Sequence, residues 1–341
     1  MTGEQVELVT MIRDSAAAVV PPGGDLSRIR GLRFRSPGFD PAALREMAAL
    51  GWIGLRLPEA RGGAGLGMTE SVALYEELGR GLVPEPLIAL TLSATLLAAT
   101  GEGALLARLL SGAALVATAG AHRLDRATPG RHDVVEVADL AEAFLMPDGS
   151  GLWLVPRDAV VLTPIALQDG GRMATIASPP GAGRRIAADA TAAFAHAQDE
   201  AALGTAAYLL GVAEAAFALT LVYLGQRRQF DRPLAAFQVL QHRMADLKIQ
   251  LVLTRASVTA AAAELDGGAD EHARARATSR AKARASDVAL LVGREAIQLH
   301  GAIGYTDEYD AGLYLRRAMV LAGQYGSAHD HRRRFAALEG G

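Results

Sequence analysis

Hydrophobic residues are densest between Leu203 and Leu224, where Glu214 carries the only charge. A helix that is apolar on nearly every side packs inside a core, so this run predicts a buried helix. Pro233 would end that helix, and the next periodic segment begins with Phe237 and Gln238. Two further helices follow from the periodicity, over Leu240–Leu265 and Glu271–Leu299.

The front of the chain also follows a helical period. Hydrophobic and polar residues alternate in a loose helical pattern over residues 6–19, and the helix breaker Pro21–Gly24 follows. Asp40 is placed as an N-cap, Pro41 occupies the first helical position, and Gly51 would end the helix that they open. Residues 87–110 read as further core helices, so we expect a helical first domain over residues 1–112.

From residue 113 the hydrophobic period shortens to two, and Pro and Gly separate the apolar runs. This change predicts a small β-domain over residues 113–197, before helical patterning resumes at Gln198. The expected fold is therefore α+β and mostly α, with a four-helix bundle over residues 198–341. The predicted strands are Leu115–Ala119, Val134–Val137, Phe144–Met146, Leu152–Val155, Val160–Leu162, Thr175–Ala177 and Ala187–Phe194.

Composition narrows the function classes. Half of the 341 residues are hydrophobic and the net charge is −3, which gives no indication of nucleic acid or an anionic membrane as a partner. The absence of cysteine excludes a disulfide scaffold and thiol chemistry. No signal peptide is predicted, and the apolar segment Leu87–Thr100 is too short to span a bilayer. A soluble cytoplasmic protein is the expectation.

The buried run leads directly into Arg227, Arg228, Gln229 and Phe230. A cation at this point complements the negative end of the helix dipole, and a guanidinium can also grip a phosphate with two hydrogen bonds. A capped helix end with solvated arginines and a phosphate-binding site both remain open from these residues alone.

Three other clusters favour structural interpretations. The glycines of residues 62–67 lack the Lys-Ser/Thr of a P-loop, so we interpret them as a flexible connector. The basic positions of the last long helix (Arg274, Arg276, Arg280, Lys282 and Arg284) indicate a solvated face, because acidic residues balance them. His329-Asp330-His331 lacks a third ligand at metal-binding spacing, which favours an exposed helix start.

The string after the buried run closely resembles a C-terminal signature of the flavin-dependent acyl-CoA dehydrogenase family: Arg227-x-Gln229-Phe230-x-x-Pro233-Leu234-x-x-Phe237-Gln238. In that family the arginine and the Gln-Phe pair contact the FAD pyrophosphate, the Phe-Gln pair lies near the cofactor, and this FAD is held mainly by the adjacent subunit. The resemblance implies the same contacts here. Asp231 departs from the pattern, because the family has glycine after the phenylalanine.

A second string resembles the family's Gln-x-x-Gly-Gly-x-Gly-Tyr/Phe motif: Gln298-Leu299-His300-Gly301-Ala302-Ile303-Gly304-Tyr305. The resemblance implies that Gln298, Gly301 and Ala302 also reach the neighbouring subunit's FAD. A glycine turn lets backbone approach a dinucleotide, and a glutamine amide can bond to it. The segment from Gly51-Trp52 to Glu76-Glu77-Leu78-Gly79-Arg80 resembles the family's N-terminal signature, and Asp169-x-x-Arg172 resembles its middle domain.

The middle domain departs from the family. Members carry a Glu-Pro-x-Ala-Gly-Ser-Asp type loop after the first strand and a Trp/Phe-Ile-Thr/Ser element, which together seat the flavin ring and the acyl thioester. Here Gly120–Asp125 follows the first strand, and neither element has a counterpart.

The catalytic base is also missing. Most members use a glutamate in a Tyr-Glu-Gly-Thr turn, and Tyr325 stands at that position; a phenol with a pKa near ~10 is a poor base at neutral pH. Other members use a glutamate near the start of the helix that leads to Arg227, where this chain has Ala201. Glu200 is one residue away, about 100° around a helix. Asp199 and Glu200 are more simply interpreted as carboxylates at a helix N-terminus.

The resemblance therefore implies one subunit of a heteromeric α2β2 acyl-CoA dehydrogenase, similar to the short subunits that act on bulky steroid side-chain thioesters. A longer partner would carry the base and most of the acyl-CoA site, and an electron-transfer flavoprotein would accept the electrons. No catalytic residue is assigned to this chain. Two alternatives remain: a self-sufficient homo-oligomer that uses Glu200, and a flavin-free scaffold of the same fold.

Overall fold

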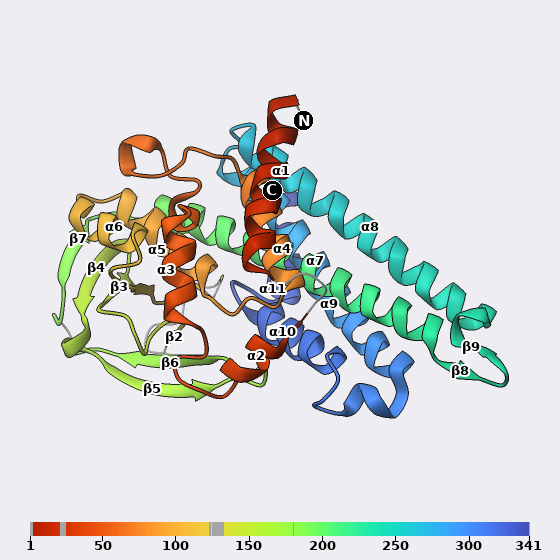
Figure 1. The fold of residues 1–341 in the computed structure, drawn as a ribbon. Coiled ribbons are helices and arrows are strands. Elements are labelled where there is room, and N and C mark those ends of the chain that lie inside the picture. The colour runs from red at the N-terminus through yellow and green to blue at the C-terminus, as the bar shows by residue number, and fades with distance from the viewer. Residues whose placement is uncertain (1–2, 21–24, 123, 125–132, 180, 341) are drawn as a thin grey trace. The chain divides into compact units, whose positions relative to one another are not determined.

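Two units, each assembled from separate segments, make up the computed structural model, which describes residues 3–20, 25–122, 124, 133–179 and 181–340. The helical unit comprises Met1–Arg28, Val72–Val83 and Leu203–Gly341, and the mixed unit comprises Ile29–Ser71 and Pro84–Ala202. Figure 1 shows the ribbon coloured along the chain. The expected breaker Pro21–Gly24, and Arg123 and Asp125 of the loop after the first strand, lie outside the described residues.

Most helices begin and end near the predicted residues. Asp40 caps its helix by accepting a 2.8 Å hydrogen bond from the Ala42 amide, and Gly51 follows the helix in the left-handed conformation, with φ 78°. The helices are α1 (Gly3–Val19), α2 (Ser27–Leu32), α3 (Pro41–Ala49), α4 (Met68–Arg80), α5 (Leu87–Ala98), α6 (Gly103–Leu110), α7 (Thr191–Gln226), α8 (Gln238–Asp266), α9 (Glu271–His300), α10 (Ala311–Gly323) and α11 (Ala328–Glu339). Short 3₁₀ turns cover Trp52–Gly54, Glu59–Arg61, Arg157–Ala159, Leu234–Ala236 and Gly301–Tyr305.

Two small sheets form the β part of the mixed unit. One has the strand order β1-β3-β4-β7 and the other β2-β6-β5, and among the described strands only the β1–β3 pair is parallel. Buried residues of both sheets, including Phe144, Val155 and Ile176, form one shared apolar core. The strands are β1 (Val116–Thr118), β2 (Asp133–Val135), β3 (Ala143–Asp148), β4 (Gly151–Pro156), β5 (Val161–Ala166), β6 (Arg172–Ala177) and β7 (Arg184–Ala187).

The predicted strand Ala187–Phe194 is wrong. Strand β7 ends at Ala187, and α7 begins at Thr191, whose amide donates to the Asp189 carboxylate at 2.9 Å. The Phe194 amide then bonds to the Ala190 carbonyl, which starts the helix. Alanine-rich residues behind an aspartate favour helix initiation over an extended strand.

The glycine cluster after α3 is a packed turn instead of the expected plain connector. A Cβ atom on Gly63 would lie 2.1 Å from the Leu57 carbonyl oxygen and 2.5 Å from that of Gly54. The amides of Gly63 and Gly65 bond to the carbonyls of Pro58 and Leu57. Only glycine allows the chain to approach itself this closely, so the cluster serves the fold.

Helices α4 and α7 cross at two glycines in the helical unit. A Cβ on Gly79 would lie 2.1 Å from the Tyr208 carbonyl oxygen, and one on Gly211 would lie 2.0 Å from that of Glu76. The Tyr208 hydroxyl donates to the Val83 carbonyl at 2.8 Å beside this crossing. The close approach explains the glycine of the Glu-Glu-Leu-Gly-Arg string.

Helix α7 is the single described helix that is long and apolar enough to cross a membrane, and 61% of its most apolar window is buried in the protein. Its buried positions include Ala206, Leu209, Leu210 and Ala213. This burial is that of a core helix, as the apolar run Leu203–Leu224 predicted.

Candidate functional site

The segment after α7 is a tight hairpin. Helix α7 ends at Gln226, not at Pro233 as expected, and strands β8 (Arg228–Gln229) and β9 (Arg232–Pro233) pair antiparallel. Their two-residue turn places Phe230 at φ 53° and Asp231 at φ 61°. Two positive φ values are the mark of a type I′ turn, in which the second position favours glycine but tolerates aspartate. The departure from the family pattern at Asp231 therefore leaves the turn intact.

The hairpin presents its side chains to solvent. The Phe230 side chain is 85% exposed, and its ring meets that of Phe237 edge-on at 6.2 Å. The Arg232 guanidinium stacks 3.8 Å from the Phe237 ring centroid, and Arg228 donates to the Asp231 carbonyl at 2.7 Å. These contacts hold the turn rigid while Phe230 stays uncovered.

Arg227, Gln229 and Gln238 flank this turn and are exposed. Among the residues that the structure describes, their side chains have no hydrogen-bond or ion-pair partner. The Arg227 amide continues the α7 ladder by bonding to the Tyr223 carbonyl at 2.8 Å, so the backbone of this arginine is fixed while its guanidinium is available.

The second string lies at the end of α9. Gln298 is exposed in the last helical turn, and Gly301 leaves the helix with φ 65°. A Cβ on Gly301 would meet no atom within 4 Å, so the space beside its backbone is open. Ala302 is exposed in the following 3₁₀ turn. A ligand can therefore reach the backbone as well as the amide side chain here.

The two strings meet at one end of the helical unit (Figure 1). The Tyr223 hydroxyl donates to the His300 carbonyl at 3.2 Å, and the two rings stack with centroids 4.3 Å apart. Tyr223 lies one turn before Arg227, and His300 lies between Gln298 and Gly301. The structure thus gathers a guanidinium, amide side chains and an open glycine turn, a donor set that fits the pyrophosphate and polar groups of a dinucleotide.

The turn around Tyr325 is closed. Its ring is 1% exposed, and its carbonyl oxygen accepts from His331 at 2.9 Å. Lys282 is fully buried, and its ammonium donates to the carbonyls of Leu321, Ala322 and Gly326 and to Ser286 at 3.1 to 3.3 Å. These contacts cap the end of α10 and fix the turn where the family's base would stand.

Lys282 and His331 correct two expectations. The predicted solvated face is wrong for Lys282, which points into the helical unit, where burial lowers its pKa to about 7. The predicted exposed helix start is wrong for His331, which is fully buried and bonds to Ser279 at 3.2 Å; burial and the charge of Lys282 lower its pKa to about 3. No group of three metal-ligating side chains is found across the described positions.

Glu200 is paired within the mixed unit. It lies in the third turn of α7, not at the helix start as expected, and is 6% exposed. Arg56 Nε lies 2.7 Å and His196 Nε2 3.1 Å from its carboxylate. Burial alone would raise the pKa of Glu200, but hydrogen bonds from His196 and Arg56 and their charges hold it below its ordinary value. A base for α-proton removal needs an elevated pKa, so this environment opposes that role.

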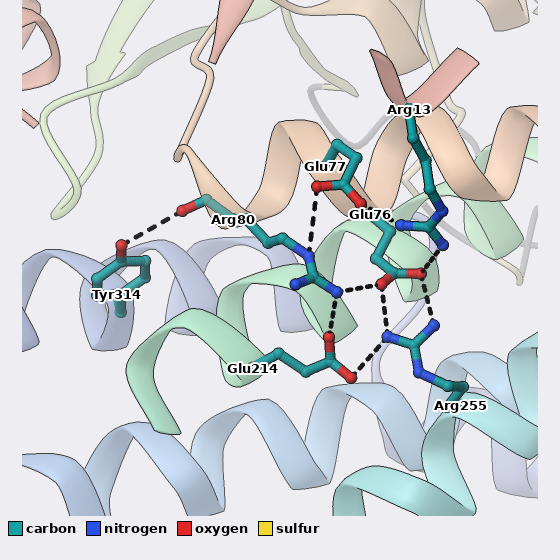
Figure 2. Close-up of polar contacts among 7 residues, drawn as sticks. All are labelled: Arg13, Glu76, Glu77, Arg80, Glu214, Arg255 and Tyr314. Carbon is teal, nitrogen blue, oxygen red and sulfur yellow. Dashed lines mark hydrogen bonds and ion pairs between the residues drawn. The ribbon is translucent and has the colours of Figure 1, made fainter. Parts of the chain in front are cut away.

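The N-terminal signature forms an ion-pair network in the helical unit (Figure 2). Glu76 is 1% exposed and lies between Arg13 at 3.1 Å, Arg80 at 2.5 Å and Arg255 at 2.5 Å. Glu214 bridges Arg80 and Arg255, at 2.5 and 2.6 Å. Burial alone would raise the pKa of Glu76, but Arg255 and Arg13 lower it to about 2. The network joins α1, α4, α7 and α8, so this signature serves the fold.

Comparison with known proteins agrees with this architecture. The acyl-CoA dehydrogenase N-terminal domain model matches residues 2–115, and the C-terminal domain model matches residues 181–337. The acyl-CoA dehydrogenase IpdE2 of Mycolicibacterium smegmatis is 32% identical over 96% of this chain and 97% of its own length. IpdE2 of Mycobacterium tuberculosis is also 32% identical, over 90% of each chain.

Solved structures with the same fold superpose on nearly the whole chain. A variant of the Tcur3481-Tcur3483 steroid ACAD superposes with a TM-score of 0.86 at 27% identity, covering 98% of each chain. The ChsE4-ChsE5 complex from Mycobacterium tuberculosis gives 0.83 at 24% identity over 100% of this chain and 98% of that one, which shows the fold. The chain belongs to the acyl-CoA dehydrogenase family. FAD is the cofactor of that family.

Proposed function

We propose that this protein is one subunit of a heteromeric FAD-dependent acyl-CoA dehydrogenase. It contributes FAD contacts across a subunit interface, and a longer partner carries the flavin, the acyl-CoA thioester and the catalytic carboxylate. The contacting residues are Arg227, Gln229, Phe230, Phe237, Gln238, Gln298, Gly301 and Ala302.

The proposal rests on a contrast between two parts of the chain: the polar side chains that would contact FAD are exposed, whereas the positions of the catalytic base are buried or paired. The side chains of Arg227, Gln229, Gln238 and Gln298 lie at one exposed end of the helical unit, without a side-chain partner among the described residues. A guanidinium fork and glutamine amides at this end can donate to phosphate oxygens. FAD held by Arg227, Gln229, Gln238 and Gln298 would supply the hydride acceptor for the β-hydrogen of the thioester.

The two positions at which family members carry the catalytic glutamate support a base supplied by the partner subunit. Tyr325 is buried in a capped turn, and Ala201 has no ionisable group. Glu200 is engaged by Arg56 and His196. A carboxylate with an elevated pKa must then come from the partner.

Exposed apolar side chains near the site favour a protein partner. Phe230 and Val239 are 85% and 65% exposed, and Ile249, Val252 and Leu253 farther along α8 are about half exposed. Grouped apolar side chains of this size on one helix are typical of a surface that another chain covers.

The assembly is an α2β2 heterotetramer located in the cytoplasm. Similarity to the Tcur3481-Tcur3483 steroid ACAD supports a bulky, steroid-type acyl group as the substrate. The reaction is the α,β-dehydrogenation of that acyl-CoA thioester, and an electron-transfer flavoprotein receives the electrons.

Co-expression with a longer acyl-CoA dehydrogenase chain from a neighbouring gene tests the proposal. We expect FAD and turnover only in the complex, and we expect Arg227→Ala in this chain to lower the flavin content of the purified complex. Arg333→Ala is the matched control, because Arg333 is an exposed arginine on α11 outside both strings; it should leave the flavin content unchanged.

Other outcomes separate the alternatives. Flavin and turnover in the isolated chain, abolished by Glu200→Gln, would support a self-sufficient enzyme. Absence of flavin in both the chain and the complex would support a scaffold. Unchanged flavin content in the Arg227→Ala complex would refute the contact across the interface.

A further inference from the structure

A partly buried aromatic cluster links the two FAD strings. It consists of Tyr223 on α7, His300 at the end of α9, and Tyr309 in the loop before α10. The ring centroids of His300 and Tyr309 are 4.7 Å apart, and those of Tyr223 and Tyr309 are 6.2 Å apart. His300 is 3% exposed.

The hydrogen bonds of His300 fix its tautomer. Nδ1 lies 2.7 Å from the Ala296 carbonyl oxygen, which can only accept, so Nδ1 carries the proton. Nε2 is then an acceptor and takes the Tyr309 hydroxyl at 3.1 Å. Burial lowers the pKa of His300, which favours this neutral form.

Each member of the cluster is joined to a segment that carries FAD contacts. The Tyr223 carbonyl accepts from the Arg227 amide, and the Tyr223 hydroxyl donates to the His300 carbonyl. His300 lies between Gln298 and Gly301 in the chain. The hydrogen bond from Tyr309 to His300 holds the loop that follows them. The cluster therefore sets the spacing between the arginine of one string and the glutamine of the other.

We propose that His300 and Tyr309 are positioning residues, which hold Arg227 and Gln298 at the separation that a single bound FAD requires. This inference rests on the proposed function. The two residues touch each other and the backbone of the FAD segments, and they act on the cofactor through Arg227 and Gln298.

The test uses the co-expressed complex and its dissociation constant for FAD, measured by flavin fluorescence. Tyr309→Phe keeps the ring but leaves His300 Nε2 without its donor, and we expect about tenfold weaker FAD binding, the effect of one lost hydrogen bond to a buried acceptor. His300→Phe should weaken binding similarly. Arg333→Ala is the control, because Arg333 is exposed on α11 and lies outside both strings; it should have no effect.

A double-mutant cycle distinguishes positioning from general stability. If Tyr309 acts through Arg227, then Tyr309→Phe should weaken FAD binding much less once Arg227→Ala is present. The KM for acyl-CoA at saturating FAD should stay unchanged. Additive effects, or normal FAD affinity in Tyr309→Phe beside a weakened Arg227→Ala complex, would overturn the positioning role alone. Unchanged FAD binding in Arg227→Ala itself would overturn the proposed function as well.

Discussion

Replacing Glu76 with glutamine tests the ion-pair network of Figure 2. The substitution keeps the size of the side chain and removes its charge from among Arg13, Arg80 and Arg255. Because Glu76 is buried, neutralising it takes away the carboxylate that all three arginines share, while Glu77 and Glu214 remain beside them. The arginines left behind are about one third exposed, so the cost stays below the full penalty of an unpaired buried charge, and Glu76→Gln should destabilise the chain by up to about 3 kcal/mol at neutral pH.

The pKa gives a second measure of the same interaction. Arg255 and Arg13 lower the pKa of Glu76 from 4.5 to about 2, and each unit corresponds to about 1.4 kcal/mol. The depressed pKa means that the stabilisation is complete above pH ~4.5 and is lost as the pH falls towards 2. The full contribution is about 3 kcal/mol, of which about 2 kcal/mol should be lost by pH 3.

Urea unfolding between pH 7 and pH 3 measures both effects. The wild-type free energy of unfolding should fall by about 2 kcal/mol more than that of Glu76→Gln over this range. Glu77→Gln is the matched control; Glu77 is the next residue on α4, pairs with Arg13 and Arg80, and is partly exposed. It should cost less than about 1 kcal/mol. If Glu76→Gln retained the wild-type acid dependence, the assignment of the low pKa to this network would be wrong.

Three further outcomes are expected. Asp231→Gly should stabilise the chain by up to about 1 kcal/mol in thermal unfolding, because glycine adopts the left-handed turn conformation without strain. Gly79→Ala should lower the melting temperature strongly, because its Cβ would lie 2.1 Å from the Tyr208 carbonyl, whereas Gly225→Ala, with no atom within 4 Å, should be neutral or slightly stabilising. Tyr325→Glu should give no dehydrogenation by the isolated chain in a dye-reduction assay, because position 325 is buried in a capped turn; turnover would contradict that view.

Local signals in the sequence predicted the helices well. Asp40-Pro41 marked the start of α3, and the apolar period from residue 271 gave α9 to within one residue of its end. The Arg227 and Gln298 strings could be located because they resemble two motifs of the acyl-CoA dehydrogenase family. Their meeting at one end of the helical unit depends on the Tyr223–His300 contact, which no local pattern reveals.

The environment of individual polar residues was harder to predict. Lys282 was grouped with its basic neighbours, although 100° per residue places it on the side of Ala275 and Ala289, which are 3% and 1% exposed. Helical periodicity could therefore have indicated its burial. For Glu200 the sequence shows only the nearby His196, four residues earlier on the same helix, because the second partner Arg56 comes from a segment 144 residues earlier.

The Phe230 turn separates residues that serve the fold from residues that serve a ligand. Glu76 and Gly79 are explained by contacts within the helical unit. Phe230 has a left-handed backbone and an 85% exposed ring, two features that raise the free energy of the isolated chain. The Phe237 ring meets Phe230 only edge-on, so under the proposed function the remaining cost is offset by a bound group that covers both Phe230 and Arg227. The proposal that FAD binds at a subunit interface meets that requirement, since its pyrophosphate would face Arg227 while the partner subunit would cover the ring.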